Sequence, residues 1–218
     1  MGFFDDMPPP PPPVEPPRME VLPWMGPPPG WVGGWVPWHV VVMRNTNVRA
    51  VLTDFQAFPS GVLFTLAAWF RPGVFGSEAD PPRPPVMMSL GTADGPLLGV
   101  GFADGRKTAL HRPLPTAGLE PDGPVLTLCG GGGGSAQEQM GIWLWPLPPD
   151  GPMSLVTAWP RAGIEETTIT LDATELTSAA DEAEELWPDE PRPAGWFGFS
   201  RSVEIRNDSR IRRPNLDD

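Results

Sequence analysis

Several residue types that usually carry chemistry are scarce in this chain. Its 218 residues include one cysteine, Cys129, two histidines, His39 and His111, and no tyrosine. A single cysteine excludes an internal disulfide and a multi-cysteine metal site. The two distant histidines do not make a zinc-binding spacing. We therefore predict neither a metal site nor a cofactor.

Long hydrophobic runs are also missing. The nearly continuous apolar run Val62–Phe70 is too short to span a membrane. The N-terminal residues Met1–Met7 have neither the basic start nor the apolar core of a signal peptide. The formal net charge of -12 disfavours nucleic acid and anionic membrane surfaces as partners, because both are negatively charged. We expect a cytoplasmic protein without membrane insertion or nucleic-acid binding.

Proline and glycine are abundant instead. The chain holds 33 prolines, 25 glycines and 10 tryptophans, and 40% of its residues are hydrophobic. Such a proline and glycine content approaches that of low-complexity chains, whereas the hydrophobic content is sufficient for a packed core. We predict a proline-, glycine- and tryptophan-rich arm over residues 1–36, one β domain over 37–188 and a polar tail over 189–218, with both ends disordered.

The arm has two interpretations. Pro8–Pro13 is expected to form an extended polyproline II helix. It is either a ligand for an aromatic groove in a protein partner or a spacer. Four tryptophans, Trp24, Trp31, Trp35 and Trp38, are costly to leave in water, so we expect residues 24–38 to lie on the surface of the domain. A protein partner of unknown identity, bound through the arm, is the partner that the sequence suggests.

The central part of the chain is rich in short β-type segments. A β-hairpin is predicted over residues 48–70, with a turn at Phe58–Gly61 in which Gly61 supplies a positive φ. Further short strands are predicted at residues 38–43, 86–90, 97–102, 125–129, 139–147, 153–159 and 164–171.

One amphipathic helix is predicted over residues 173–187. Asp172 can cap its N-terminus, and Glu175 follows at the capping-box spacing. Apolar residues recur at helical spacing on one face, acidic residues occupy the other face, and Pro188 ends the helix. Together with the strands, this predicts a mainly β fold: an antiparallel β-sandwich, jelly-roll or immunoglobulin-like, with one C-terminal amphipathic helix.

A run of five consecutive glycines, Gly130–Gly134, which we call the glycine run, has two interpretations, and a phosphate-binding loop is one of them. Such a loop needs a nearby lysine and a following helix, and the sequence offers neither. We therefore interpret the run as a mobile connection between strands at 125–129 and 139–147. Consecutive glycines cost conformational entropy on folding, so Gly131, Gly132 and Gly133 remain candidates for ligand contact.

Aromatic residues give the second set of candidate ligand-binding residues. Trp143 and Trp145 lie two residues apart and therefore share one face of a strand, while Ile142 and Leu144 share the other. With Trp159, they could stack on a sugar or small molecule in a jelly roll. Apolar residues on both faces make burial on both sides the simpler interpretation.

Catalytic residues are not evident. A hydrolase would have to use Cys129 as nucleophile with His111 and an acid, but a cysteine at the end of an apolar strand is more often a small buried residue. Glu165 and Glu166 are adjacent, so a strand would turn them to opposite faces. We predict no catalytic residue.

Two aspartates at similar turns are the remaining candidates for an ion site. Asp94 and Asp104 each precede a glycine, and both could donate oxygens to calcium from neighbouring loop tips. Asp-Gly pairs are typical of tight turns, which explains both aspartates without a metal.

Five segments together resemble a group of uncharacterised proteins from GC-rich actinobacteria, over about residues 37–187. The segments are Phe58–Gly61, Gly101–Lys107, the glycine run, Trp143–Pro152 and Ala158–Ile164. The resemblance implies no activity and carries no functional residues. The function expected from the residues is a non-catalytic protein-interaction or structural module. A carbohydrate- or small-molecule-binding jelly roll is the first alternative, and a cysteine-dependent hydrolase is the second.

Overall fold

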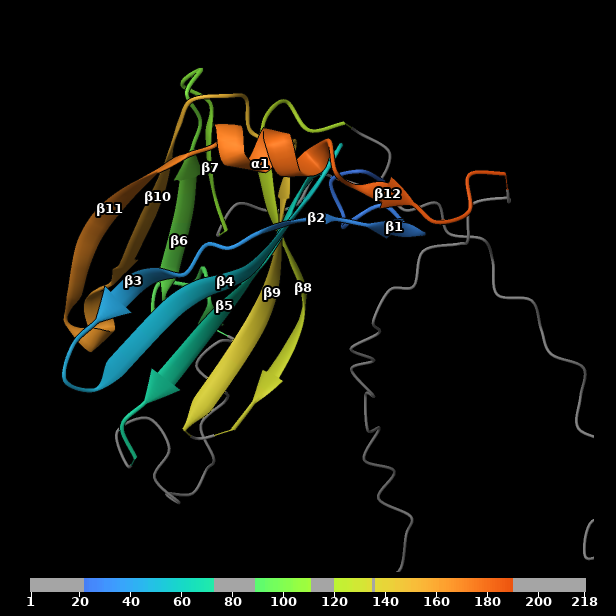
Figure 1. Cartoon of the computed structure of the whole chain (residues 1–218). Helices are drawn as coiled ribbons and strands as arrows, with labels where there is room; N and C mark the ends of the chain where they lie inside the picture. Colours follow the sequence, from blue (N-terminus) through green and yellow to red (C-terminus); the bar gives the residue numbers. More distant parts are fainter. Residues whose placement is uncertain (1–21, 73–88, 111–119, 135, 190–218) are drawn as a thin grey trace, which may run out of the picture.

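The protein is mainly β. The computed structural model describes residues 22–72, 89–110, 120–134 and 136–189, whose strands form antiparallel sheets accompanied by one α-helix (Figure 1). Pro8–Pro13, His111 and the tail beyond Asp189 lie outside the described residues, and so do the predictions made for them.

One sheet has six strands. Its spatial order is β2 (Gly34–Val36), β4 (Val48–Phe58), β5 (Gly61–Phe70), β9 (Gln137–Trp145) and β8 (Val125–Gly133), and β3 (Val40–Arg44) also pairs with β4. β2 pairs with the second half of β4 and β3 with the first half. β5 is therefore the central strand, which agrees with its nearly continuous apolar sequence.

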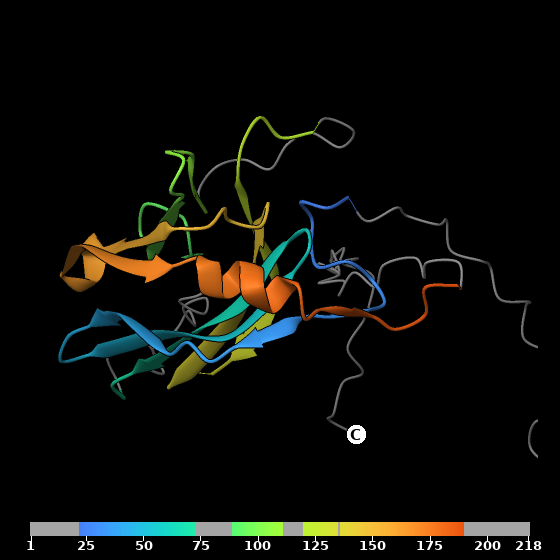
Figure 2. The ribbon, with the colours of Figure 1, turned by 45° about the horizontal axis from the view of Figure 1, so that its top comes forward.

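A second sheet has four strands. Its spatial order is β11 (Ile164–Asp172), β10 (Pro152–Trp159), β6 (Leu97–Gly101) and β7 (Lys107–Ala109). A separate two-stranded ribbon joins β1 (Trp31–Val32) to β12 (Glu184–Glu185). The helix, α1 (Thr174–Ala180), follows β11, and its buried residues belong to the main core. Figure 2 shows α1 beside the gap between the two larger sheets.

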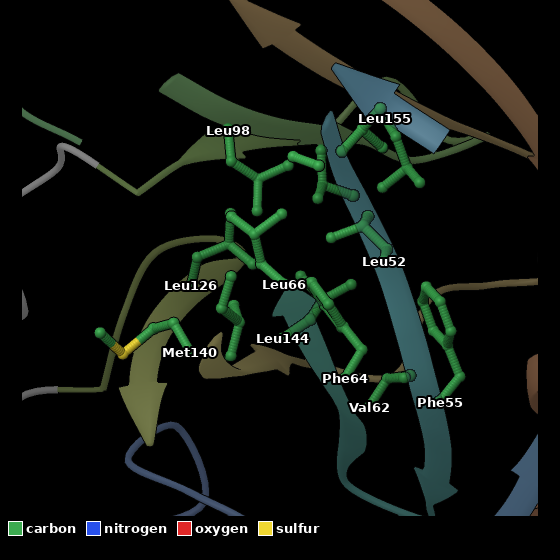
Figure 3. Close-up of a cluster of buried hydrophobic side chains, with 14 of the residues drawn as sticks. Leu52, Phe55, Val62, Phe64, Leu66, Leu98, Leu126, Met140, Leu144 and Leu155 are labelled. Carbon is green, nitrogen blue, oxygen red and sulfur yellow. The ribbon is translucent and has the colours of Figure 1, made fainter. Parts of the chain in front are cut away.

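The two larger sheets face each other across one hydrophobic core. Leu98 and Leu155 come from the four-stranded sheet and approach Leu52 and Leu66 of the six-stranded sheet (Figure 3). Side chains alternate between the two faces of a strand, so every second residue of β5 from Val62 enters this core. Burial of these aliphatic and aromatic side chains stabilises the fold, at about 1.5–3 kcal/mol for each large side chain.

The hairpin predicted over residues 48–70 is confirmed. β4 and β5 are antiparallel, and Phe58 pairs with Gly61 across a two-residue turn. The expectation of a positive φ at Gly61 was wrong, because Gly61 is not among the described glycines with positive φ. A Cβ at Gly61 would lie 2.4 Å from the carbonyl oxygen of Leu144 on β9. Close approach of two strands, rather than turn conformation, therefore requires glycine here.

The predicted helix is shorter than expected. It begins at Thr174 and ends at Ala180, not at residue 187. Asp172 does accept a hydrogen bond from the backbone N–H of Thr174 at 3.0 Å, but Ala173 is the N-cap residue. Acidic side chains crowd the chain after the helix, and carboxylates near a helix C-terminus oppose its dipole. The chain there forms β12 instead.

Strands already occur within the predicted arm. β1 and β2 lie before residue 37, where the sequence placed the start of the β domain. A Cβ at Gly34 would lie 1.7 Å from the carbonyl oxygen of Ala179, so α1 rests directly on the backbone of β2. This contact ties the segment before residue 37 to the C-terminal helix.

The remaining strand predictions are confirmed except at one segment. β6, β9, β10 and β11 match the strands predicted at 97–102, 139–147, 153–159 and 164–171. Ser89 and Leu90 form a helical turn and not a strand, and the rest of the predicted strand at 86–90 lies outside the described residues. The tight turn at Asp104-Gly105 is present, with Gly105 at φ 86°.

Candidate functional site

Trp143 lies on the outer face of the six-stranded sheet and is nevertheless fully buried. Its indole N–H donates a hydrogen bond to the backbone carbonyl of Pro23 at 2.9 Å. Phe58 meets its ring edge-on, with the ring centres 5.7 Å apart. The side chain therefore has its hydrogen bond satisfied and no ring face open to a ligand.

The chain just before β1 forms the cover over this tryptophan. Thr127 on β8 donates a hydrogen bond to the backbone carbonyl of Trp24 at 2.9 Å. The buried ring of Trp24 meets Trp145 edge-on at 5.9 Å. Residues 22–26 thus cross the outer face of β9 and β8, and Trp145 is left half-buried at their margin. Trp24 packs against the surface of the domain, as the cost of exposing tryptophan predicted, and fills a second, smaller apolar cluster.

Trp159 occupies a third environment, in the main core between the sheets. It is buried, its indole N–H donates to the carbonyl of Asp94 at 3.1 Å, and Phe70 meets it edge-on at 6.4 Å. The three tryptophans proposed as ligand residues are therefore not brought together. Trp143 and Trp159 act as core residues, and Trp145 alone retains partial access to solvent.

The glycine run is not a mobile connection, and that expectation was wrong. β8 continues to Gly133, so that Gly131, Gly132 and Gly133 pair with Met140, Gln139 and Glu138 of β9. The register shifts between Leu128 and Gly131, and Gly130 in this bulge has φ 89°. Glycine supplies the positive φ that the bulge requires. The glycines form a strand and not a loop because β9 provides an antiparallel partner for the backbone of Gly131–Gly133.

The end of this hairpin forms an open depression of about 630 Å³. It is lined by Gly132–Gly134, by Ala136 and by the first residues of β9, Gln137–Gln139. The glycine side of the depression carries no side chains, so it offers backbone groups without a specific ligand-binding group.

Cys129 lies at the bulge that precedes the paired glycines. The residue is exposed, yet protein atoms crowded around the thiol raise its pKa to about 11. A hydrogen bond from the backbone of Trp143 opposes this effect only in part. A nucleophilic cysteine needs a lowered pKa, because the thiolate is the reactive form. Burial therefore works against the chemistry that a cysteine hydrolase requires.

The two turn aspartates are engaged with arginines. The carboxylate of Asp104 accepts hydrogen bonds from the backbone N–H and the side chain of Arg106, which lower its pKa. Asp94 forms an exposed ion pair with Arg161 at 3.0 Å. Within residues 22–72, 89–110, 120–134 and 136–189, no group of three or more potential ligands is placed to hold a metal ion.

Exposed apolar side chains mark a surface that the sequence analysis did not single out. Four of the six large exposed hydrophobic residues in the described chain lie on β1, on β2 or just after β12: Val32 (52%), Trp35 (56%), Leu186 (41%) and Trp187 (57%). We name these four residues the aromatic end. Pairing of β1 with β12 brings the two chain segments together, although they are about 150 residues apart. No local sequence pattern could have indicated this pairing.

An open groove of about 350 Å³ lies between β2 and α1. Trp35, Val36 and Pro37 line its strand side, and the other side is lined by Asp172, Thr174, Glu175, Ser178, Ala179 and Glu182. Hydrogen bonds from Thr174 lower the pKa of Asp172, and Glu175 accepts a hydrogen bond from the indole of Trp38 at 2.9 Å. The helix wall of the groove is thus negatively charged at neutral pH.

Comparison with known proteins yields no relative: no protein-family profile, no curated protein and no solved structure matches the chain. Among the described residues, no helix is long and apolar enough to cross a lipid bilayer.

Proposed function

We propose that the chain is a β-sandwich that acts as a non-catalytic protein-interaction module. The exposure of Val32, Trp35, Leu186 and Trp187 on β1, on β2 and just after β12 carries this proposal. Two sheets that share one core support the sandwich assignment. The resemblance to actinobacterial proteins remains a prediction and adds no activity to it.

The physical argument is the cost of leaving these side chains in water. Large apolar side chains exposed on neighbouring chain segments can mark a site where another protein binds. Tryptophan is enriched among the residues that dominate binding energies, because it buries a large rigid surface and keeps one polar N–H. None of these four side chains belongs to the main hydrophobic core.

The proline-rich arm supplies a second contact in this proposal. Pro8–Pro13 precede Leu22, where the described chain enters the cover over Trp143. A polyproline segment adjacent to the anchored chain would meet a partner's aromatic groove at small entropic cost, because polyproline II is already extended. The arm and the aromatic end would then act together on one protein partner.

Affinity capture with matched variants tests the aromatic end. We expect the double variant Trp35→Ser/Trp187→Ser to lose a protein that the wild-type chain captures from an actinobacterial extract. Trp69→Ser is the control, since it removes an exposed tryptophan on β5, which belongs to a different sheet from β1 and β12. Identical captured proteins for all three chains would contradict the proposal.

The arm requires its own deletion. Removing residues 1–21 leaves the cover of Trp143 and strands β1 and β2 intact, whereas removing residues 1–36 would delete them. We expect the shorter deletion to fold normally and to bind the partner more weakly. Unchanged binding would restrict the interaction to the aromatic end.

A further inference from the structure

The groove between β2 and α1 has the form of a site for an extended peptide. β2 is the last strand of the six-stranded sheet, and one of its edges pairs with β4. No described strand pairs with its other edge. An exposed edge presents backbone N–H and C=O groups in a row, which an added strand can satisfy. α1 packs on the face of β2 at Gly34, and residues of α1 and of the chain on either side of it line the second wall of the groove.

The negative charge of the groove favours a peptide with basic side chains. Between Asp172 and Asp189 every ionisable side chain is a carboxylate. Asp172, Glu175 and Glu182 from this stretch line the groove. A peptide with basic side chains is therefore favoured over a neutral or acidic one, and arginine pairs well with carboxylates because its guanidinium offers several donors.

The same chain carries such a peptide beyond the described residues. The segment is Ser209–Arg213, and Pro214 follows it. Basic and apolar residues alternate within it at Arg210, Ile211 and Arg212. Alternation is the pattern of a strand with two different faces, and proline stops further strand pairing. In an extended conformation, Arg210 and Arg212 would share one face.

We propose that residues 209–213 dock in this groove as a strand added to β2, with Arg210 and Arg212 directed at the carboxylates that line it, Asp172, Glu175 and Glu182. The connection is long enough. Nineteen residues separate Asp189 from Ser209, and they reach about 60–70 Å when extended, whereas α1 is only about 10 Å long. The docked segment would turn the six-stranded sheet into a seven-stranded one. The inference does not depend on the proposed interaction function.

Disulfide trapping in the full-length chain tests the docking. In a Cys129→Ser background, Ser178→Cys places a thiol in the groove and Ser209→Cys places one at the start of the docked segment. The control replaces Ser178→Cys with Thr168→Cys, an exposed position on β11 outside the groove. We expect the intramolecular disulfide of the groove pair to form at least about tenfold faster than that of the control pair, because docking raises the local thiol concentration.

Charge-reversal variants test whether an ionic contact between the groove and the docked segment, and not chance proximity, causes the trapping. Glu182→Arg alone and Arg212→Glu alone should each slow the trapping, and the two together should restore it. High salt should slow the wild-type pair as well, because exposed charges are screened. Glu166→Arg, on β11, should change nothing.

Two outcomes would overturn the proposal. Equal rates for the groove pair and the control pair would show that residues 209–213 do not dock there. A concentration-dependent disulfide between two molecules would show that the segment binds the groove of a second copy instead. Circular dichroism of each variant verifies that the fold is retained, so that a slow rate is not mistaken for unfolding.

Discussion

The indole N–H of Trp143 donates a hydrogen bond to the backbone carbonyl of Pro23, 2.9 Å away and 120 residues earlier in the chain. This contact fastens residues 22–26 over the outer face of β9. It makes the segment before β1 part of the fold. It also explains why a tryptophan on the outer side of a sheet is fully buried.

Substitutions of Trp143 should measure this contact. Trp143→Phe keeps most of the apolar surface but leaves the carbonyl of Pro23 without its donor, so we expect a loss of about 1–3 kcal/mol in the free energy of unfolding. Trp143→Ala should cost more, about 3–5 kcal/mol. Urea denaturation gives both values. The control is Trp187→Phe, an exposed tryptophan, and an equal effect in the control would argue against the contact.

Gly34 should tolerate no side chain. A Cβ there would meet the carbonyl oxygen of Ala179 at 1.7 Å, so Gly34→Ala must push α1 away from β2. We expect a destabilisation of about 1–3 kcal/mol, as for other forced overpacking. Gly123→Ala serves as the matched control, because an added Cβ at Gly123 meets nothing within 4 Å. Thermal unfolding distinguishes the two variants, and equal melting temperatures would contradict the packing of α1 on β2.

The glycines of β8 should respond unequally to alanine. At Gly131 an added Cβ would lie 2.4 Å from the carbonyl oxygen of Gln139, whereas at Gly132 it would meet nothing within 4 Å. We expect Gly131→Ala to destabilise by about 1–3 kcal/mol. Gly132→Ala should be neutral or stabilise by about 0.4–1 kcal/mol through the unfolded state. A free-hanging glycine loop would instead show two similar, small effects in urea titrations.

Cys129 should react slowly with iodoacetamide. With a pKa near 11 in place of 9.0, the thiolate at pH 8 is about 100-fold rarer than for an unperturbed thiol, and the thiolate is the reacting species. The alkylation rate should rise with pH up to about 11. Urea-unfolded protein provides the reference rate. Rapid labelling of the folded chain at pH 8 would contradict the raised pKa of the thiol.

The raised pKa of Cys129 also predicts how the free energy of unfolding changes with pH. The folded-state pKa of Cys129 lies above the value of 9.0 for a free thiol, so the thiol contributes its full stability below pH 9. That contribution is lost as the pH rises through 9 towards 11, because the unfolded chain releases the proton first. Cys129→Ser should show a shallower loss of stability over this interval in urea titrations at pH 8, 9 and 10.

Much of the β architecture could be predicted from local sequence. The hairpin of β4 and β5 follows from two apolar segments joined at Pro59-Ser60. The turn at Asp104-Gly105 follows from its residue types, because glycine readily adopts the positive φ that the turn needs. The helix could be placed but not bounded, because the apolar repeat continues to Trp187 while the acidic residues after Ala180 oppose a longer helix. The glycine run was misassigned, because glycine has no side-chain pattern by which a strand is recognised.

The sequence alone determined that this is a mainly β protein, because alternation and turn residues act over a few neighbouring positions. Only the tertiary structure decided the roles of the tryptophans. Trp143 is covered by Pro23 and Trp159 is enclosed between two sheets. Trp35 on β2 and Trp187 just after β12 are exposed to solvent. Contacts between residues 65 or more positions apart bury Trp143 and Trp159, and such contacts cannot be recognised in the local sequence pattern.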